Sequence, residues 1–229
     1  MKIKFIFICH FVLLNAGAQN SIMVRFLPKM VNEDLYLQKE YLLDKDTIDI
    51  SQLKFYISDM SFYDLDTLVY VLKKKYHLFD LSQPTTVCLA EKLVCPIKYN
   101  HVKFNIGIDS LTNVSGAMDG DLDPTNGMYW TWQSGYINFK MEGISSICPA
   151  RPKKFQWHIG GYLTPYNTLK EVSLSTQDAT NVVNIEVHID KLLRTFDLSQ
   201  THQIMSPNAR AVEIADQLPT IFKIAQDEK

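Results

Sequence analysis

The residues best suited to binding chemistry lie in two aromatic-rich stretches, MYWTWQ at 128–133 and FQWHIGGY at 155–162. Read as strands with a period of two, the first places Trp130 and Trp132 on one face, and the second turns His158 away from its apolar neighbours. Imidazole is a common metal ligand, so His158 is a candidate ligand, although a lone histidine is more often a hydrogen-bonded structural residue. Periodicity alone favours both tryptophans as core residues.

The apolar pattern changes parity after the two tryptophans. Beyond Gly135 the apolar positions become Ile137, Phe139 and Met141, which a continuous strand cannot place on the same face as the tryptophans. A β-bulge near 134–135 would reset the pattern, and glycine suits such a bulge.

An acidic segment, DGDLDPTNG at 119–127, precedes the tryptophans. Its alternating carboxylates Asp119, Asp121 and Asp123 could hold calcium, which takes six to eight oxygen ligands. The segment lacks the late glutamate of an EF-hand, and Asp, Pro, Asn and Gly are all turn formers. We therefore favour a surface turn over a calcium site.

Catalytic signatures are missing from the sequence. It contains no GxSxG, HExxH or CxxC motif and no glycine-rich phosphate loop, so residue types alone identify no specific reaction. A net charge of −2 argues against nucleic acid as a partner.

The N-terminus has the order of a secretory signal peptide. Lys2 and Lys4 precede an apolar run over residues 5–14, and Ala16-Gly17-Ala18 supplies the small residues of a cleavage site. The run is shorter than the roughly 20 residues that span a bilayer, and no later stretch qualifies. We expect residues 1–18 to be removed and residues 19–229 to form a single exported domain, in a periplasm or at the cell surface.

Three cysteines, Cys88, Cys95 and Cys148, remain after cleavage, which is an odd number for an oxidising compartment. A Cys88–Cys95 bridge would close a short loop and leave Cys148 free, but Cys148 could also pair with either of them.

Short alternating segments dominate the mature chain, and one helical period follows late. Residues 208–218 space Ala211, Ile214, Ala215 and Leu218 three and four apart, which predicts a helix. The fold class predicted is therefore all-β, a β-sandwich with a short C-terminal helix. The expected strands cover residues 21–26, 35–41, 53–62, 67–72, 76–81, 101–108, 128–133, 155–159 and 182–189.

The run GDLDPTNGMYWTWQSGYINFKMEG at 120–143, followed by FQWHIGGY, resembles the MbnP-like family of exported copper-binding proteins. The segments LKFYISDMSF, FNIGID and IMSPNARAVEIADQLPTIF resemble other parts of that family, so the resemblance covers most of the mature chain.

The resemblance implies a specific chemistry. A strand tryptophan, Trp130 or Trp132, is oxidised to kynurenine by a di-haem MauG-like peroxidase partner. Copper is then held by the kynurenine and two histidines, of which His158 is the clearest match and His202 or His188 the second. The protein itself is implied to be non-enzymatic. Two alternatives stay open: a calcium-dependent surface adhesion or glycan-binding β-sandwich module, and the substrate half of a redox pair in which copper is incidental.

Overall fold

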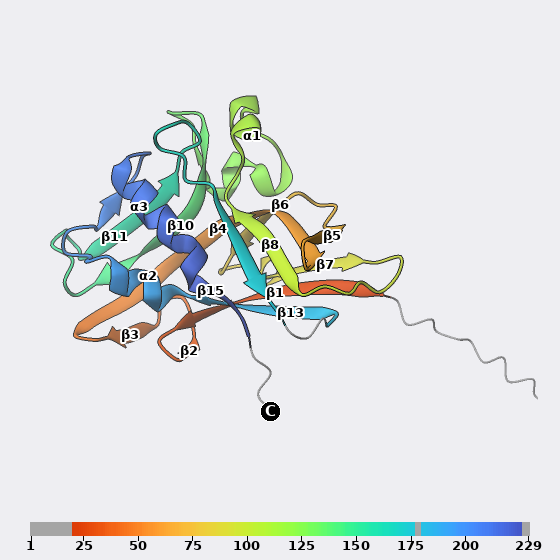
Figure 1. Ribbon diagram of the computed structural model, residues 1–229. Helices are drawn as coiled ribbons and strands as arrows, with labels where there is room; N and C mark the ends of the chain where they lie inside the picture. The colour runs from red at the N-terminus through yellow and green to blue at the C-terminus, as the bar shows by residue number, and fades with distance from the viewer. Residues whose placement is uncertain (1–19, 177–179, 226–229) are drawn as a thin grey trace, which may run out of the picture.

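The structure is a computed structural model that describes residues 20–176 and 180–225. The predicted signal peptide, residues 1–18, lies outside these ranges. The described chain forms two β-sheets, as Figure 1 shows. No helix within the described ranges is long and apolar enough to cross a membrane.

The smaller sheet has five strands in the order β15-β13-β1-β2, and β7 pairs with β1 beside them. Its centre is the parallel pair β1 and β13, in which buried apolar side chains alternate with more exposed ones. The strands are β1 (Ser21–Met30), β2 (Glu33–Asp34), β7 (Cys88–Lys92), β13 (Val182–His188) and β15 (Phe222–Ile224).

The larger sheet has ten strands and curls into a half-barrel. Its 19-residue strand β4 is long enough to pair with five others along its length. The path runs β12-β8-β4-β10-β11-β14. The strands are β3 (Glu40–Leu43), β4 (Asp46–Asp64), β5 (Thr67–Val71), β6 (Tyr76–Asp80), β8 (His101–Ile106), β9 (Tyr129–Trp130), β10 (Gly135–Ser145), β11 (Lys154–Gly160), β12 (Lys170–Ser175) and β14 (Gln203–Ile204).

Aromatic side chains join the two sheets. Phe26 of β1 meets Phe55, Phe79 and Phe104 of the larger sheet edge-to-face, with ring centroids 6.1, 6.2 and 5.8 Å away. Edge-to-face pairs add to the stabilisation from burial alone. The main core therefore lies between the sheets.

The predicted C-terminal helix is confirmed as α3 (Ala209–Gln217), which packs on β11. The Asn208 side chain caps it by accepting a hydrogen bond from the Ala211 amide at 2.9 Å. The described part of the chain is mainly β, as predicted, but it also contains two more helices, α1 (Ser110–Ser115) and α2 (Ile189–Thr195), and four short 3₁₀ turns. These turns cover Pro84–Thr86, Gly120–Leu122, Pro124–Asn126 and Leu218–Ile221.

Several strand boundaries differ from the sequence prediction, and two of the differences have a clear local cause. The strand expected over 35–41 is confined to β3, which begins at Glu40, because residues 37–38 form a turn with Gln38 at a positive φ of 60°. The strand expected to reach Ile189 stops at His188. Ile189 opens α2, where Ile189, Leu192 and Leu193 point to the core with helical spacing.

The three cysteines within the described ranges are unpaired, and the expected Cys88–Cys95 bridge is not formed. Cys88 opens β7, whose extended course along β1, at about 3.3 Å per residue, carries the chain away before the exposed Cys95 is reached. Cys148 is buried, and its thiol donates to the Lys154 carbonyl at 3.1 Å.

Candidate metal centre

The two tryptophans of MYWTWQ do not share a strand face. The strand expected over 128–133 ends at Trp130, because β9 has two residues and pairs with β10 across the turn 131–134. Trp130 is 6% exposed, whereas Trp132 lies in the turn and is 66% exposed. The ring centroids remain 6.0 Å apart. The apolar positions change from even to odd residue numbers after Gly135 because the chain reverses direction there. The bulge expected at 134–135 is not the cause.

A bulge does occur three residues later, at Asn138, where the register of β10 against β11 shifts. The buried Asn138 side chain accepts from the Ile108 amide at 3.0 Å and donates to Thr168 Oγ1 at 2.9 Å. It thereby ties β10 to the segment that follows β11, next to Trp130.

Trp130 packs over the end of β11. A Cβ atom built on Gly160 would lie 2.7 Å from Cζ3 of the Trp130 ring, so the indole occupies the space that a side chain would take. Gly160 and His158 are two residues apart on one strand and therefore share a face, about 7 Å apart along it. The structure thus brings Trp130 and His158 to the same face of β11.

His158 is buried, 7% exposed, and its Nε2 lies 2.9 Å from Oε1 of Glu142 on β10. Glu142 also accepts from Gln156 at 3.2 Å and pairs with Lys154 at 2.7 Å and Lys140 at 3.6 Å. Burial opposes ionisation of Glu142, but the bonds from Lys154 and His158 outweigh it and hold its pKa at about 2.

Burial lowers the pKa of His158 and outweighs the opposing bond to Glu142. The imidazole is therefore neutral at neutral pH. A carboxylate accepts but cannot donate, so the Nε2 atom carries the proton. Nδ1 keeps its lone pair and makes no hydrogen bond to any described residue. His158 has the tautomer and the free nitrogen that a metal ligand needs.

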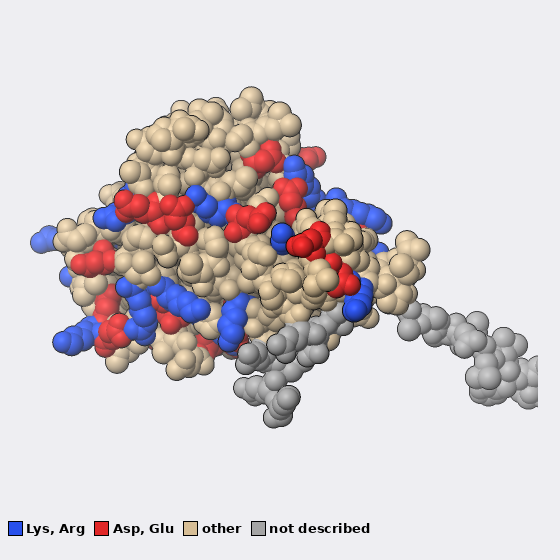
Figure 2. Space-filling model, in the orientation of Figure 1, with Lys and Arg blue, Asp and Glu red and all other residues tan. Residues whose placement is uncertain are grey.

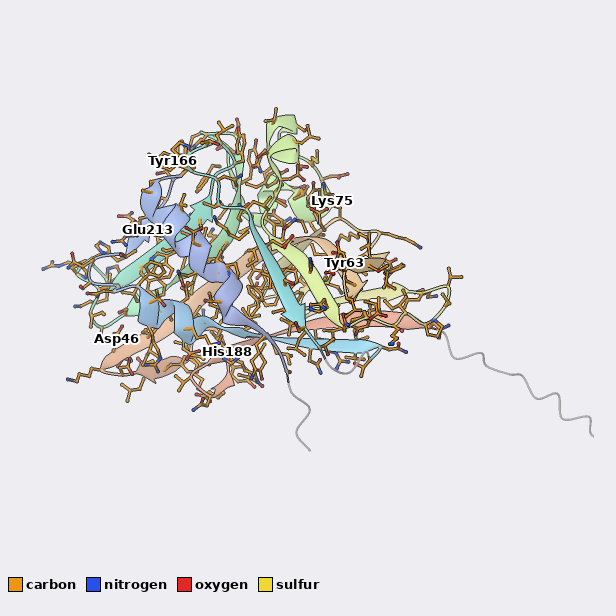
Figure 3. All side chains as sticks on the ribbon, in the orientation of Figure 1. Asp46, Tyr63, Lys75, Tyr166, His188 and Glu213 are labelled. Atoms are coloured by element: carbon orange, nitrogen blue, oxygen red, sulfur yellow. The ribbon has the colours of Figure 1, made fainter. Side chains whose placement is uncertain are left out.

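The other two candidate histidines do not join His158. His202 precedes β14, and its carbonyl accepts from the Gln156 amide at 2.7 Å. The parallel register pairs Gln203 with Gln156, so the alternation places His202 on the opposite face from His158. His188 ends β13 in the smaller sheet and contacts Glu186 at 2.9 Å. Figure 3 shows His188 far from Tyr166, which lies near Trp130.

The acidic segment forms turns, as favoured from the sequence. The Asp121 carboxylate pairs with Lys74 and accepts from the Leu78 amide, both at 2.8 Å. The Asp123 carboxylate caps the next turn by accepting from Thr125. Within the described ranges, no three His, Cys, Asp or Glu side chains are grouped to hold a metal ion. A calcium site is therefore not supported.

A pocket of about 300 Å³ opens beside Trp130. Its lining carries no charged residue: Trp130, Gln133, Gly135, the segment 161–166 and Pro207. The surrounding segments 110–118, 124–139 and 155–169 contain no Lys, Arg, Asp or Glu. Figure 2 shows the corresponding uncharged surface at the top of the molecule. We call this surface the uncharged cap; its exposed apolar side chains include Leu111, Val114, Trp132 and Leu163.

Sequence reasoning missed Glu142 and the pocket. Glu142 is adjacent to His158 through the β10–β11 register, which no local pattern in the sequence reveals. Pro207 reaches the pocket from a distant part of the chain, where a Cβ on Gly161 would meet it at 3.1 Å. The run of residues without charge, by contrast, was readable in the sequence.

Comparison with known proteins identifies the family of this chain. A model of the MbnP family matches residues 19–206, which include β9, β11 and β14. This chain belongs to the MbnP family. Among solved structures, MbnP from Methylosinus trichosporium matches with a TM-score of 0.58 and 14% identity, over 84% of this chain and 86% of that chain. Identity this low shows a shared fold.

No curated protein sequence matches the chain significantly. The family match begins at residue 19, directly after the segment predicted to be a signal peptide.

Proposed function

We propose that this chain is an exported, non-enzymatic copper-binding protein whose site lies at His158 and Trp130. The observation that carries the proposal is their common face on β11, where His158 presents a neutral imidazole with Nδ1 free. Imidazole is a favoured copper ligand. Family membership and the signal-peptide sequence support copper binding in a periplasm or at the cell surface.

Trp130 can serve as a ligand only after oxidation. Its indole Nε1 is buried without a partner in the described chain, but an indole N–H is a donor and has no lone pair to give. Opening the ring to kynurenine exposes an aryl amine with a usable lone pair. We favour Trp130 over Trp132 because Trp130 lies on the face of His158, whereas Trp132 points into solvent.

The proposed partner is a di-haem peroxidase that uses two equivalents of peroxide. Two oxygen atoms add across the C2–C3 bond of the indole and break it, and each peroxide leaves one molecule of water. Hydrolysis of the resulting formamide releases formate and leaves the amine. The uncharged cap, with the pocket that Trp130 lines, is the face through which such a partner would reach the ring.

A copper titration of protein purified from its native host tests the proposal. The His158→Ala variant is expected to lose at least about tenfold in copper affinity, since even outer-shell changes at metal sites cost about 10–100-fold. His101→Ala, which changes a histidine on β8, is the matched control and should bind as the wild type does. Mass spectrometry of the peptide containing Trp130 and Trp132 should show the mass change that corresponds to the loss of one carbon atom and the gain of one oxygen atom.

If both tryptophans are unmodified and His158→Ala binds copper with the affinity of the wild type, the copper proposal fails.

A glycan-binding surface module is the second candidate. The exposed Trp132 stands close to an aromatic-lined pocket, an arrangement suited to stacking on a sugar ring.

A further inference from the structure

We propose that the uncharged cap is a membrane-docking surface, which inserts among the headgroups of a lipid bilayer whose lipids are zwitterionic. The inference goes beyond the proposed copper function and does not depend on whether copper binds. Large apolar patches on soluble proteins mark contacts with another protein or with a membrane. The charges in and around the cap favour the membrane.

The three segments of the cap form one continuous surface. The Ser110 hydroxyl donates to the Tyr162 carbonyl at 2.9 Å and joins α1 to the loop after β11. The Tyr136 amide donates to the Asn113 side chain at 2.8 Å and joins β10 to α1. A Cβ atom built on Gly135 would lie 3.2 Å from the Tyr162 ring, so the start of β10 also contacts the loop after β11. The exposed side chains therefore stand on a common scaffold.

The side chains that the cap exposes are large and apolar, and two of them are amphipathic aromatics. They come from α1 and the loop behind it, the turn between β9 and β10, and the loop after β11: Leu111, Val114, Met118, Trp132, Leu163 and Tyr166. Figure 2 shows this end of the molecule as a rounded, uncharged surface. Trp and Tyr favour the boundary between membrane and water. The set suits the shallow insertion, about 5–10 Å deep, of proteins that lie on a bilayer.

The uncharged region has a sharp boundary in the sequence. Each of its three segments begins and ends beside a charged residue: Asp109 and Asp119, Asp123 and Lys140, and Lys154 and Lys170. Between these limits the segments contain no Lys, Arg, Asp or Glu. A bilayer imposes such an exclusion, because a charged side chain is costly inside it. Interfaces between proteins do not, since they are enriched in arginine. The absence of charge therefore favours lipid as the occupant.

The charges around the cap are of both signs and are paired. The lysine run 73–75 contacts Glu91, Asp121 and Asp109 at 4.0, 2.8 and 2.9 Å, in that order. Beside β11, Lys154 lies 2.7 Å from Glu142. Zwitterionic headgroups also carry both signs close together, so these pairs complement them without an excess of either sign. A surface for anionic lipids would instead carry a cluster of unpaired Lys and Arg.

Docking on lipid would also cover the pocket beside Trp130, because this pocket opens in the same surface. A chain bound to a bilayer would then be closed to a protein partner at Trp130. The membrane and the proposed oxidising partner would therefore compete for the cap.

Flotation of the mature chain with phosphatidylcholine vesicles tests the proposal. The wild type should float equally well at low salt and at about 1 M salt, because screening weakens contacts between charges and leaves apolar contacts intact. The double variant Leu111→Asp/Leu163→Asp places two charges at cap positions that are 78% and 63% exposed. Its partitioning should weaken by at least about tenfold, the usual contribution from burying one large apolar side chain.

The matched control is Leu42→Asp/Val94→Asp. It adds the same two charges outside the cap, at positions that are 70% and 100% exposed, and should bind as the wild type does. Tryptophan fluorescence gives a second readout that needs no variant. Trp132 is the one strongly exposed tryptophan of the three. Vesicles should shift its emission to shorter wavelength, and lipids brominated on the upper acyl chain should quench it.

Three results would overturn the proposal. The first is a wild type that does not float. The second is flotation of the cap variant equal to that of the wild type. The third is flotation that needs anionic lipid and disappears at high salt, which would assign binding to the lysines. If the wild type does not float and the cap variant loses self-association or oxidation by the partner, the cap is a protein interface. The copper titration is a separate measurement, so the copper function stands or fails independently.

Discussion

At the scale of single residues, the pair of His158 and Glu142 determines what the site can bind. Glu142 lies among Lys140, Lys154 and Gln156, which together keep it ionised. An ionised carboxylate at 2.9 Å fixes the proton of His158 on Nε2 and orients the ring. Glu142 is therefore a positioning residue. Its charge acts on metal binding only by fixing the proton and the orientation of His158.

The variant Glu142→Gln tests this role. Its amide can donate as well as accept, so it no longer fixes the proton on Nε2, and we expect copper affinity to fall by about 10–100-fold. Glu213→Gln, which removes a carboxylate from an exposed ion pair on α3, should have no effect. Nitrogen chemical shifts of His158 in copper-free protein should show one tautomer in the wild type and a mixture in Glu142→Gln. Identical shifts in both proteins would rule out the positioning role.

At the scale of elements, the ends of β9 and β11 bring the site together. Gly160 has no side chain, and the Trp130 ring fills the vacant position. In Gly160→Ala, the new Cβ would meet the Tyr136 carbonyl at 2.6 Å and the Trp130 ring at 2.7 Å. We expect Trp130 to be displaced and the free energy of unfolding to fall by about 1–3 kcal/mol, the usual cost of overpacking.

Tryptophan fluorescence and chemical denaturation measure the two effects of Gly160→Ala together. The control Ser173→Ala changes an exposed position on β12 and should leave both quantities unchanged. An unshifted spectrum with full stability in Gly160→Ala would contradict the placement of Trp130 over β11.

The sequence predicted the elements that follow a clear period and missed those that depend on contacts between distant segments. Alternation located β4, β8, β11 and β13, and the helical period located α3. The alternation also predicted that the His158 side chain lies on the opposite face of its strand from Trp157. It could not reveal that β9 ends at Trp130, because a turn within MYWTWQ leaves the alternating pattern intact. Nor could it exclude His202, whose orientation follows from the pairing of β14 with β11.

At the scale of the whole molecule, buried ionisable groups link stability to pH. His77 on β6 has a buried Nε2 without a partner in the described ranges. Burial, aided by the charge of Lys74, lowers its pKa from 6.5 to about 4. The folded chain thus keeps His77 neutral at pH values where the unfolded chain already binds a proton.

The direction of the pH effect follows from this difference. Between about pH 6.5 and pH 4 the unfolded state binds more protons at His77, so the free energy of unfolding must fall as the pH falls through that range. His77→Leu removes the titrating group together with an unsatisfied buried nitrogen. We expect this variant to lose less stability than the wild type between these two pH values.

Urea denaturation over a series of pH values measures the effect, and the range above about pH 7 is the internal control, since His77 is then neutral in both states. There the difference between variant and wild type should be constant. Glu142, with its folded pKa of about 2, causes a separate loss of stability as the pH falls below its ordinary value of 4.5. That loss should persist in His77→Leu. Parallel curves for the two proteins over the whole range would show that His77 is exposed enough to take up its proton without penalty.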